Sequence, residues 1–220
     1  MNSLLISTLS EVPELTDLKT RFINLKSILF DMDGTLFNTE KYHAIALKNL
    51  GEELKIRSPL SEKEMFHLMV GKADHLLFDI IKDWPRFPVH LSVEEFIHRK
   101  NNHLLNILSQ TNSEQYFSEK LRILLTEIKK NNFFIGLVTS SEKIITHELL
   151  KSSQITDLFN FILTRDDSLK VKPDPWPYLY TINQSCFTPQ ETLIFEDSQV
   201  GIEAAEKSGA NVLKANWYRD

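Results

Sequence analysis

Residues 27–36 read Ser-Ile-Leu-Phe-Asp-Met-Asp-Gly-Thr-Leu, a short apolar run that ends in two carboxylates one residue apart. In an extended strand, alternate residues point to the same side, so Asp31 and Asp33 are expected to point the same way. Like charges this close raise one another's pKa and need a reason to coexist. The usual reasons are a hard divalent cation or an acid/base pair. The segment therefore predicts a strand that delivers two carboxylates to a polar site.

Short apolar runs recur along the chain and alternate with helical patterns. They lie at residues 25–30, 133–138, 159–163, 193–195 and 211–214. Near-continuous apolar strands between helices are typical of a parallel sheet that is covered on both faces. The sequence thus predicts an α/β fold, with a doubly wound, three-layer parallel sheet of Rossmann-like type.

The long segment between the first two runs contains only helical patterns. Ser61 and Ser92 are each followed three residues later by a glutamate, which is the capping-box pattern of a helix start. An earlier helix is expected over residues 39–50, with Gly51 ending it. We therefore expect an α-helical cap over residues 38–113, and its position directly after the carboxylates makes it a candidate lid. The catalytic core is then expected to comprise residues 1–37 and 114–220.

The composition limits the classes of partner. The 220 residues suffice for one large domain with an insertion, and the formal net charge of −5 argues against nucleic acid. The single cysteine, Cys186, cannot form an internal disulfide, which fits a reducing compartment. No apolar run reaches the roughly 20 residues of a membrane span, and the start lacks the basic region of a signal peptide. We expect a cytoplasmic enzyme with no membrane partner.

Polar residues stand where the strands are expected to end. Thr139 and Ser140 follow the second run, Glu196 and Asp197 follow the fourth, and Lys172 lies in the loop before the fourth. In open parallel sheets, ligands bind beyond the carboxyl ends of the strands. Carboxylate oxygens suit Mg²⁺, and a hydroxyl and a lysine opposite the metal can hold the remaining oxygens of a phosphoryl group. The pattern predicts a magnesium-assisted phosphoryl site.

Four segments carry a family resemblance. They are Asp31-x-Asp33-Gly34-Thr35-Leu36, Leu137-Val138-Thr139-Ser140, Lys172-Pro173 and Glu196-Asp197-Ser198-x-x-Gly201-Ile202-x-Ala204-Ala205. In this order and on these element types they resemble the motifs of the haloacid dehalogenase-like superfamily of phosphatases. The four segments frame nearly the whole chain beyond residue 25.

The resemblance implies a role for each motif residue. Asp31 is implied as the nucleophile that forms an aspartyl-phosphate, and Asp33 as general acid and then base. Thr139 is implied to hydrogen-bond the phosphoryl oxygens, and Lys172 to neutralise the charge of the nucleophile and the phosphate. Because the dehalogenases and phosphonatases of the superfamily lack an acid at the position of Asp33, its presence favours phosphate-ester chemistry.

The resemblance also implies a metal shell and a phosphate cradle. Asp197 is implied to bind Mg²⁺, with Glu196 in or beside that shell and the backbone carbonyl of Asp33 on the metal. Gly34 permits a tight turn that presents backbone amides to the phosphate, and Thr35 and Ser140 are expected beside the substrate. The expected metal-binding set is Asp31, Asp33, Asp197 and Glu196.

The helical cap resembles the subgroup that contains beta-phosphoglucomutase and small sugar- or polyol-phosphate phosphatases. His43 falls where that mutase has a histidine that couples cap closure to acid/base work, although packing beside Tyr42 is the alternative. Lys72, in a loop between two expected helices, either meets a second anionic group of the substrate or is a solvated surface lysine. The arginine that the mutase carries in its equivalent loop has no clear counterpart here.

Three hypotheses about function follow. The first is a Mg²⁺-dependent phosphatase that acts on a small phosphorylated metabolite, and the second is a sugar phosphomutase that uses the same residues. The third is a non-catalytic binding protein, against which the intact motif residues argue. The sequence does not indicate which ester is the substrate or what the oligomeric state is. Residues 1–24 match no part of the family pattern, and we expect an added helix or an interaction arm there.

Overall fold

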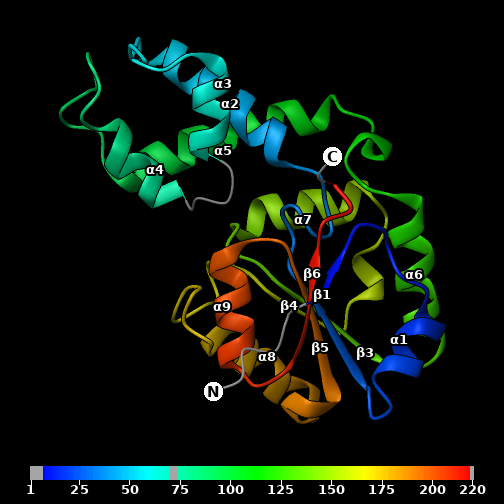
Figure 1. The fold of residues 1–220 in the computed structure, drawn as a ribbon. Helices are drawn as coiled ribbons and strands as arrows, with labels where there is room; N and C mark the ends of the chain where they lie inside the picture. The colour runs from blue at the N-terminus through cyan, green and yellow to red at the C-terminus, as the bar shows by residue number, and fades with distance from the viewer. Residues whose placement is uncertain (1–6, 70–73, 219–220) are drawn as a thin grey trace. The chain divides into compact units, whose positions relative to one another are not determined.

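The computed structural model describes residues 7–69 and 74–218 (Figure 1). The chain divides into two compact units. Unit 1 comprises Met1–Asn38 and Ser113–Asp220, and unit 2 comprises Thr39–Asn112. Unit 1 holds the sheet and the helices around it, and unit 2 is built from helices.

Unit 1 is built on a six-stranded sheet in which every pair of neighbours is parallel, in the order β1-β6-β5-β2-β3-β4. The strands are β1 (Ser7–Leu9), β2 (Ser27–Phe30), β3 (Phe134–Val138), β4 (Phe161–Leu163), β5 (Thr192–Glu196) and β6 (Asn211–Ala215). The five predicted strands correspond to β2 through β6. The predicted doubly wound parallel sheet is confirmed.

Helices cover both faces of this sheet. Figure 1 shows α1 (Leu15–Arg21) and α6 (Glu119–Lys130) on one side, and α8 (Trp176–Ser185) and α9 (Gln199–Lys207) on the other. A further helix, α7 (Lys143–Ser152), follows β3, and three single turns of 3₁₀ helix complete unit 1. These turns are η1 (Ser113–Gln115), η2 (Thr156–Leu158) and η3 (Pro189–Glu191). The arrangement gives the three layers that the alternating pattern predicts.

The central strand β2 is buried over its whole length because alternate side chains enter opposite layers. Leu29 belongs to a cluster that it shares with Tyr178 and Ile182 of α8 and with residues of α9. Its neighbour Phe30 points to the other face and stacks on Phe195 of β5, with ring centroids 5.1 Å apart. Apolar contacts on both faces therefore hold the last residue of β2 in place.

The register of the strands brings their carboxyl ends level. Phe30 of β2 pairs with Phe195 of β5 on one side and with Leu137 of β3 on the other. The residue after Phe30 and the residue after Phe195 therefore emerge side by side, as does the end of β3. The polar segments that follow these strands meet at one edge of the sheet.

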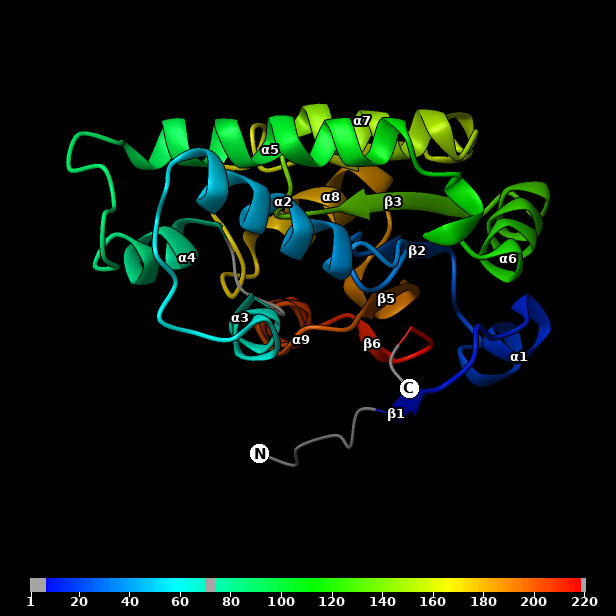
Figure 2. The same ribbon diagram turned by 90° about the horizontal axis from the view of Figure 1, so that it is seen from above.

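The segment before β2 adds a strand that the sequence analysis missed. The expected helix is present as α1, but Ser7–Leu9 also forms β1, which pairs with β6 at the edge of the sheet (Figure 2). Arg21 reinforces this addition by donating a hydrogen bond to the Ser7 hydroxyl at 2.6 Å. Strand β1 has only three residues, Ser-Thr-Leu, and none of them is fully buried. It therefore lacks the continuous apolar run by which a buried strand is recognised.

The described residues of unit 2 form the helices α2 (Glu40–Glu53), α3 (Glu62–Met69), α4 (Asp74–Ile81) and α5 (Val93–Ser109). Both predicted capping serines begin helices, since the Ser61 hydroxyl faces the Glu64 amide at 3.4 Å and the Ser92 hydroxyl accepts from the Glu95 amide at 3.2 Å. The expected end at Gly51 is wrong. Helix α2 continues to Glu53, because burial of Leu50 and the packing of the partly buried Leu54 against the helical core outweigh the weak helix propensity of one glycine.

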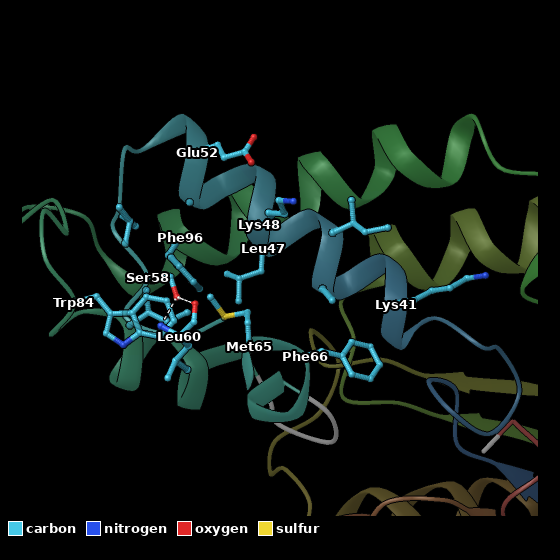
Figure 3. A pocket seen from close by; sticks show the side chains of 15 residues that line it. Lys41, Leu47, Lys48, Glu52, Ser58, Leu60, Met65, Phe66, Trp84 and Phe96 are labelled. Carbon is cyan, nitrogen blue, oxygen red and sulfur yellow. Dashed lines mark hydrogen bonds between the residues drawn. The ribbon is translucent and has the colours of Figure 1, made fainter. Parts of the chain in front are cut away.

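Unit 2 also has a cavity of about 480 Å³ that is open to solvent (Figure 3). Most of its wall is apolar and includes Leu47, Met65, Phe66, Trp84 and Phe96. Polar residues also line it, namely Lys41, Lys48, Glu52 and Ser58. None of the helices in the described part of the chain has the length and hydropathy that a membrane crossing requires.

Candidate active site

Three buried carboxylates meet at the carboxyl edge of the sheet in unit 1. Asp31 follows β2, Glu196 ends β5 and Asp197 comes next, and one oxygen from each lies within 4.8 Å of the others. All three residues are buried, and Glu196 has no exposed surface. The level strand ends account for this convergence, because each strand delivers its next residue to the same edge.

Lys172 is the cation of this cluster. Its ammonium group donates to Asp31 Oδ1 and to Glu196 Oε1, both at 2.6 Å, and to the backbone carbonyl of Val138 at 3.1 Å. The side chain is only 5 % exposed, although it comes from the loop before α8. One buried lysine therefore links the ends of β2, β3 and β5.

Burial and neighbouring charges shift the pKa values in this cluster. Burial raises the pKa of Asp31 well above its usual value, the carboxylates of Glu196 and Asp197 raise it further, and Lys172 opposes the shift. Burial by itself would lower the pKa of Lys172, but Asp31 and Glu196 raise it well above its usual value, so this lysine stays protonated. Lys172 thus pairs with two of the three buried carboxylates. The oxygen donors of the three fit a hard divalent cation such as Mg²⁺.

Glu196 is held by donors from the protein on both oxygens. Oε1 accepts from Lys172 and from the Tyr178 hydroxyl at 2.9 Å, while Oε2 accepts from the amide and the hydroxyl of Ser198 at 3.1 and 3.0 Å. A side chain at Gly201, in the first turn of α9, would overlap this carboxylate. The glycine therefore lets α9 approach closely, and the position of Glu196 is set by four hydrogen bonds.

Asp33 is held by a residue that follows β3. Its Oδ2 accepts a hydrogen bond of 2.5 Å from the Ser141 hydroxyl, which follows β3. The Ser141 amide in turn donates to Thr139 Oγ1 at 2.9 Å, and Thr139 is buried, whereas Ser140 is exposed. Ser141 thus ties the Asp33 carboxyl group to the end of β3.

Residues 31–37, which we call the Asp31 loop, are folded back on themselves. Gly34 has a φ of +85°, and its amide donates to the carbonyl of Phe37 at 2.8 Å. The hydroxyl of the buried Thr35 donates to Asp197 Oδ1 at 3.3 Å. Gly34 therefore adopts a backbone conformation that favours glycine, and Thr35 faces a carboxylate of the cluster.

The two predicted substrate contacts in unit 2 have different outcomes. His43 lies on α2, and its Nδ1 is 3.2 Å from the ammonium group of Lys100. Lys100 is buried and forms an ion pair of 2.5 Å with Asp74, so it provides a fixed cation beside the histidine. Lys72 falls outside the described residues.

Ser141 and Tyr178 contact the predicted site but were not among the predicted site residues. Ser141 directly follows Thr139 and Ser140, but its partner Asp33 could not be read from the pattern. Tyr178 bears no motif signal at all. Burial and the neighbouring Glu196 raise the pKa of its hydroxyl well above its usual value, so it remains a hydrogen-bond donor to that carboxylate.

Comparison with known proteins places these observations in a family. Residues 28–215 match a family model described as haloacid dehalogenase-like hydrolase. The chain is 28 % identical over 188 residues to a beta-phosphoglucomutase of Bacillus subtilis (strain 168), and the match covers 84 % of this chain and 80 % of the relative. It is 25 % identical over 196 residues to a pyrophosphatase PpaX of Bacillus cereus (strain G9842), which covers 89 % of this chain and 85 % of that protein.

The fold is also shared with solved structures. A crystal structure of CbbY from Rhodobacter sphaeroides in complex with phosphate superimposes with a TM-score of 0.76 at 20 % sequence identity, and the match covers 86 % of this chain and 85 % of that one. At this identity the likeness concerns the fold alone.

Proposed function

This chain belongs to the haloacid dehalogenase-like hydrolase family, and on that premise we propose that it is a Mg²⁺-dependent phosphatase acting on a small phosphomonoester through an aspartyl-phosphate on Asp31. The family context is that of phosphatases and phosphomutases. One observation carries the proposal, namely a buried carboxylate, Asp31, held by Lys172 next to two further carboxylates. The proposed substrate resembles a sugar or polyol phosphate, and the proposed location is the cytoplasm.

The metal-binding residues in this proposal are Asp31, Asp197 and the backbone carbonyl of Asp33, with Glu196 beside them. Glu196 already accepts four hydrogen bonds from the protein, so we assign it mainly to holding Lys172 and the start of α9. When bound, Mg²⁺ supplies positive charge that offsets the charge of the phosphoryl group beside the carboxylates.

In the first half of the reaction, an oxygen of Asp31 attacks phosphorus and the bond between phosphorus and the ester oxygen breaks. Asp33, in its protonated form, gives its proton to the leaving oxygen, so the alcohol departs neutral. The hydrogen bond from the Ser141 hydroxyl holds the Asp33 carboxyl group at the end of β3, where the proposed transfer takes place. The products are the alcohol and an aspartyl-phosphate.

In the second half, Asp33 accepts a proton from water as that water attacks the phosphorus. The bond between phosphorus and Asp31 breaks, inorganic phosphate leaves and the Asp31 carboxylate is restored. Lys172 and the Thr139 hydroxyl hold phosphoryl oxygens in both halves, with Gly34, Thr35 and Ser140 around them. Each of these residues lies on a segment that begins or ends at the carboxyl edge of the sheet.

A panel of phosphomonoesters tests the proposal. We expect the protein to release inorganic phosphate from at least one small sugar or polyol phosphate in the presence of Mg²⁺. Excess EDTA should remove the activity and added Mg²⁺ should restore it, because the three carboxylates repel a phosphoryl group when no cation offsets them. Failure to release phosphate from any ester of a broad panel would contradict the phosphatase proposal.

Sugar phosphomutase activity is the second candidate. The resemblance to the Bacillus subtilis beta-phosphoglucomutase favours it. A mutase would return the phosphoryl group to the sugar, so it would interconvert glucose 1-phosphate and glucose 6-phosphate without net release of phosphate. Both compounds belong in the panel, and sugar phosphates and free phosphate should be measured in the same samples.

Ser141→Ala tests the proposed role of Asp33. Loss of one hydrogen bond to the acid/base group is expected to lower kcat about tenfold and to leave KM within about twofold, because the bond orients Asp33 rather than the substrate. The pH–rate profile should change as well, since the removed donor contacts the carboxyl group that transfers the proton. Ser109→Ala, on the exposed side of α5, is the control. An unchanged kcat and pH profile would count against this role.

A further inference from the structure

Two aromatic residues that follow β6 contact the Asp31 loop from within unit 1. The indole N–H of Trp217 donates to the backbone carbonyl of Thr35 at 2.8 Å. The hydroxyl of Tyr218 donates to the next carbonyl, that of Leu36, at 3.1 Å. Two consecutive carbonyls of the loop are therefore held by side chains that no motif includes.

Trp217 also packs against the strands that lead into the acidic segments. Its ring meets Phe195 edge to face at 5.6 Å, and Phe195 stacks on Phe30 at 5.1 Å. Phe30 directly precedes Asp31, and Phe195 directly precedes Glu196. The indole is thus the third of three packed rings that support the ends of β2 and β5.

The contact of Trp217 with Thr35 continues to the carboxylate cluster. Thr35 has no exposed surface, and its hydroxyl donates to Asp197 Oδ1 at 3.3 Å. Trp217 therefore holds the backbone of the same residue whose side chain contacts Asp197. A displacement of Thr35 would change the contact that orients this carboxylate.

Tyr218 links the Asp31 loop to a second element. Its hydroxyl accepts from the amide of Ser118, the N-cap of α6, at 3.3 Å while it donates to Leu36. Burial raises the pKa of Tyr218 to about 12, so the hydroxyl retains the proton that it donates. The phenol thus joins the loop after β2 to the beginning of α6.

We propose that Trp217 and Tyr218 are positioning residues for the metal and phosphoryl site, since they fix the Asp31 loop so that Thr35 orients Asp197. This inference rests on the proposed function, in which Asp197 binds Mg²⁺. Its physical basis is preorganisation, because a carboxylate that is already oriented need not be ordered when the cation arrives.

Trp217→Phe tests this role, because phenylalanine keeps a ring in the aromatic stack and loses the N–H donor. We expect the dissociation constant of Mg²⁺, measured by titration calorimetry with magnesium chloride alone, to rise about five- to tenfold. The value of kcat should fall by a similar factor, while KM for the phosphoester stays within about twofold. Trp84→Phe is the matched control, because Trp84 lies on the wall of the cavity in unit 2.

Tyr218→Phe provides a second, independent variant that removes one hydroxyl and keeps the ring. It should also weaken Mg²⁺ binding relative to the control Tyr180→Phe, whose hydroxyl lies on the exposed side of α8. Thermal unfolding of each variant in EDTA separates the positioning role from a loss of folding. A lower unfolding temperature with unchanged Mg²⁺ affinity and unchanged kcat would overturn the positioning role.

The outcomes separate this inference from the proposed function. If the protein binds Mg²⁺ and Trp217→Phe weakens that binding, the positioning role is supported even when no ester of the panel is hydrolysed. If the protein hydrolyses an ester but Trp217→Phe and Tyr218→Phe behave like their controls, the positioning role is overturned and the proposed function stands. A protein that binds no Mg²⁺ overturns the inference directly.

Discussion

Asp31→Asn is expected to abolish turnover, with a loss in kcat on the order of 10⁴-fold or more, because the amide cannot replace the carboxylate as nucleophile. The wild-type protein, quenched with acid during turnover, should yield a peptide containing Asp31 that carries a phosphoryl group, and the variant should not. Asp157→Asn, at an exposed aspartate in η2, serves as the control. Retention of more than about a tenth of the wild-type rate would place the nucleophile elsewhere.

The same substitution is expected to stabilise the metal-free protein at neutral pH. Because the pKa of Asp31 is raised in the folded state above its ordinary value of 3.8, the folded state binds this proton more tightly than the unfolded state does. The contribution of Asp31 to stability is therefore present at low pH and is lost as the pH rises through the raised value. Asparagine has no such dependence.

Urea unfolding in EDTA, carried out from acidic to neutral pH, measures the stability of Asp31→Asn relative to the wild type. The advantage of Asp31→Asn over the wild type should be largest at neutral pH and should shrink as the pH falls. Added Mg²⁺ should reverse the order, because the cation stabilises the wild-type carboxylate. An inactive variant that is less stable than the wild type at every pH in EDTA would contradict the electrostatic account of the cluster.

Lys172→Met has the second large expected effect. The substitution leaves Asp31 and Glu196 buried without their shared cation, and removing one partner of a buried ion pair costs about 3–5 kcal/mol of unfolding free energy. The loss of activity is expected to be on the order of 10³-fold, because the Lys172 ammonium group then no longer faces the phosphoryl oxygens. Chemical denaturation and steady-state kinetics measure the two effects separately.

Lys170→Met is a matched control for this variant. Lys170 lies two residues earlier in the same loop and pairs with Asp174 at 3.0 Å, but its side chain is 59 % exposed. Exposed pairs of this kind contribute about 0–1 kcal/mol, so the control should be nearly as stable as the wild type. The penalty of Lys172→Met should become smaller at acidic pH, where protonation removes the uncompensated charge of Asp31. Similar behaviour of the two variants would show that Lys172 does not neutralise the cluster.

The fold was largely predictable because its signals are local. Apolar runs such as residues 133–138 are read from consecutive residues, and their alternation with helices implies parallel strands. The strand β1 escaped prediction because its three residues have no apolar pattern and depend on pairing with β6. The extension of α2 past Gly51 escaped for a related reason, since packing within unit 2 overrides the weak propensity of a single glycine.

The residues of the candidate site also fall into two groups, those that the sequence could indicate and those that it could not. Asp31, Lys172, Glu196 and Asp197 could be named in advance, because residues that follow parallel strands meet at one edge of a sheet. The roles assigned to them remain predictions. Neither Tyr178 nor Trp217 could be named, because the chemistry of each depends on a partner that its own surroundings in the sequence do not reveal.

By itself, the sequence determined the class of fold, the order of the motifs and the acidic segments that follow the strands. The physical reason is that strand burial and strand ends are encoded by neighbouring residues. Only the tertiary structure decided how the charges and hydrogen bonds are shared. Ser141 reaches Asp33 across 108 positions of the chain, and Trp217 reaches Thr35 across 182. Contacts of this kind arise from the packing of distant segments, and no local pattern of residues encodes them.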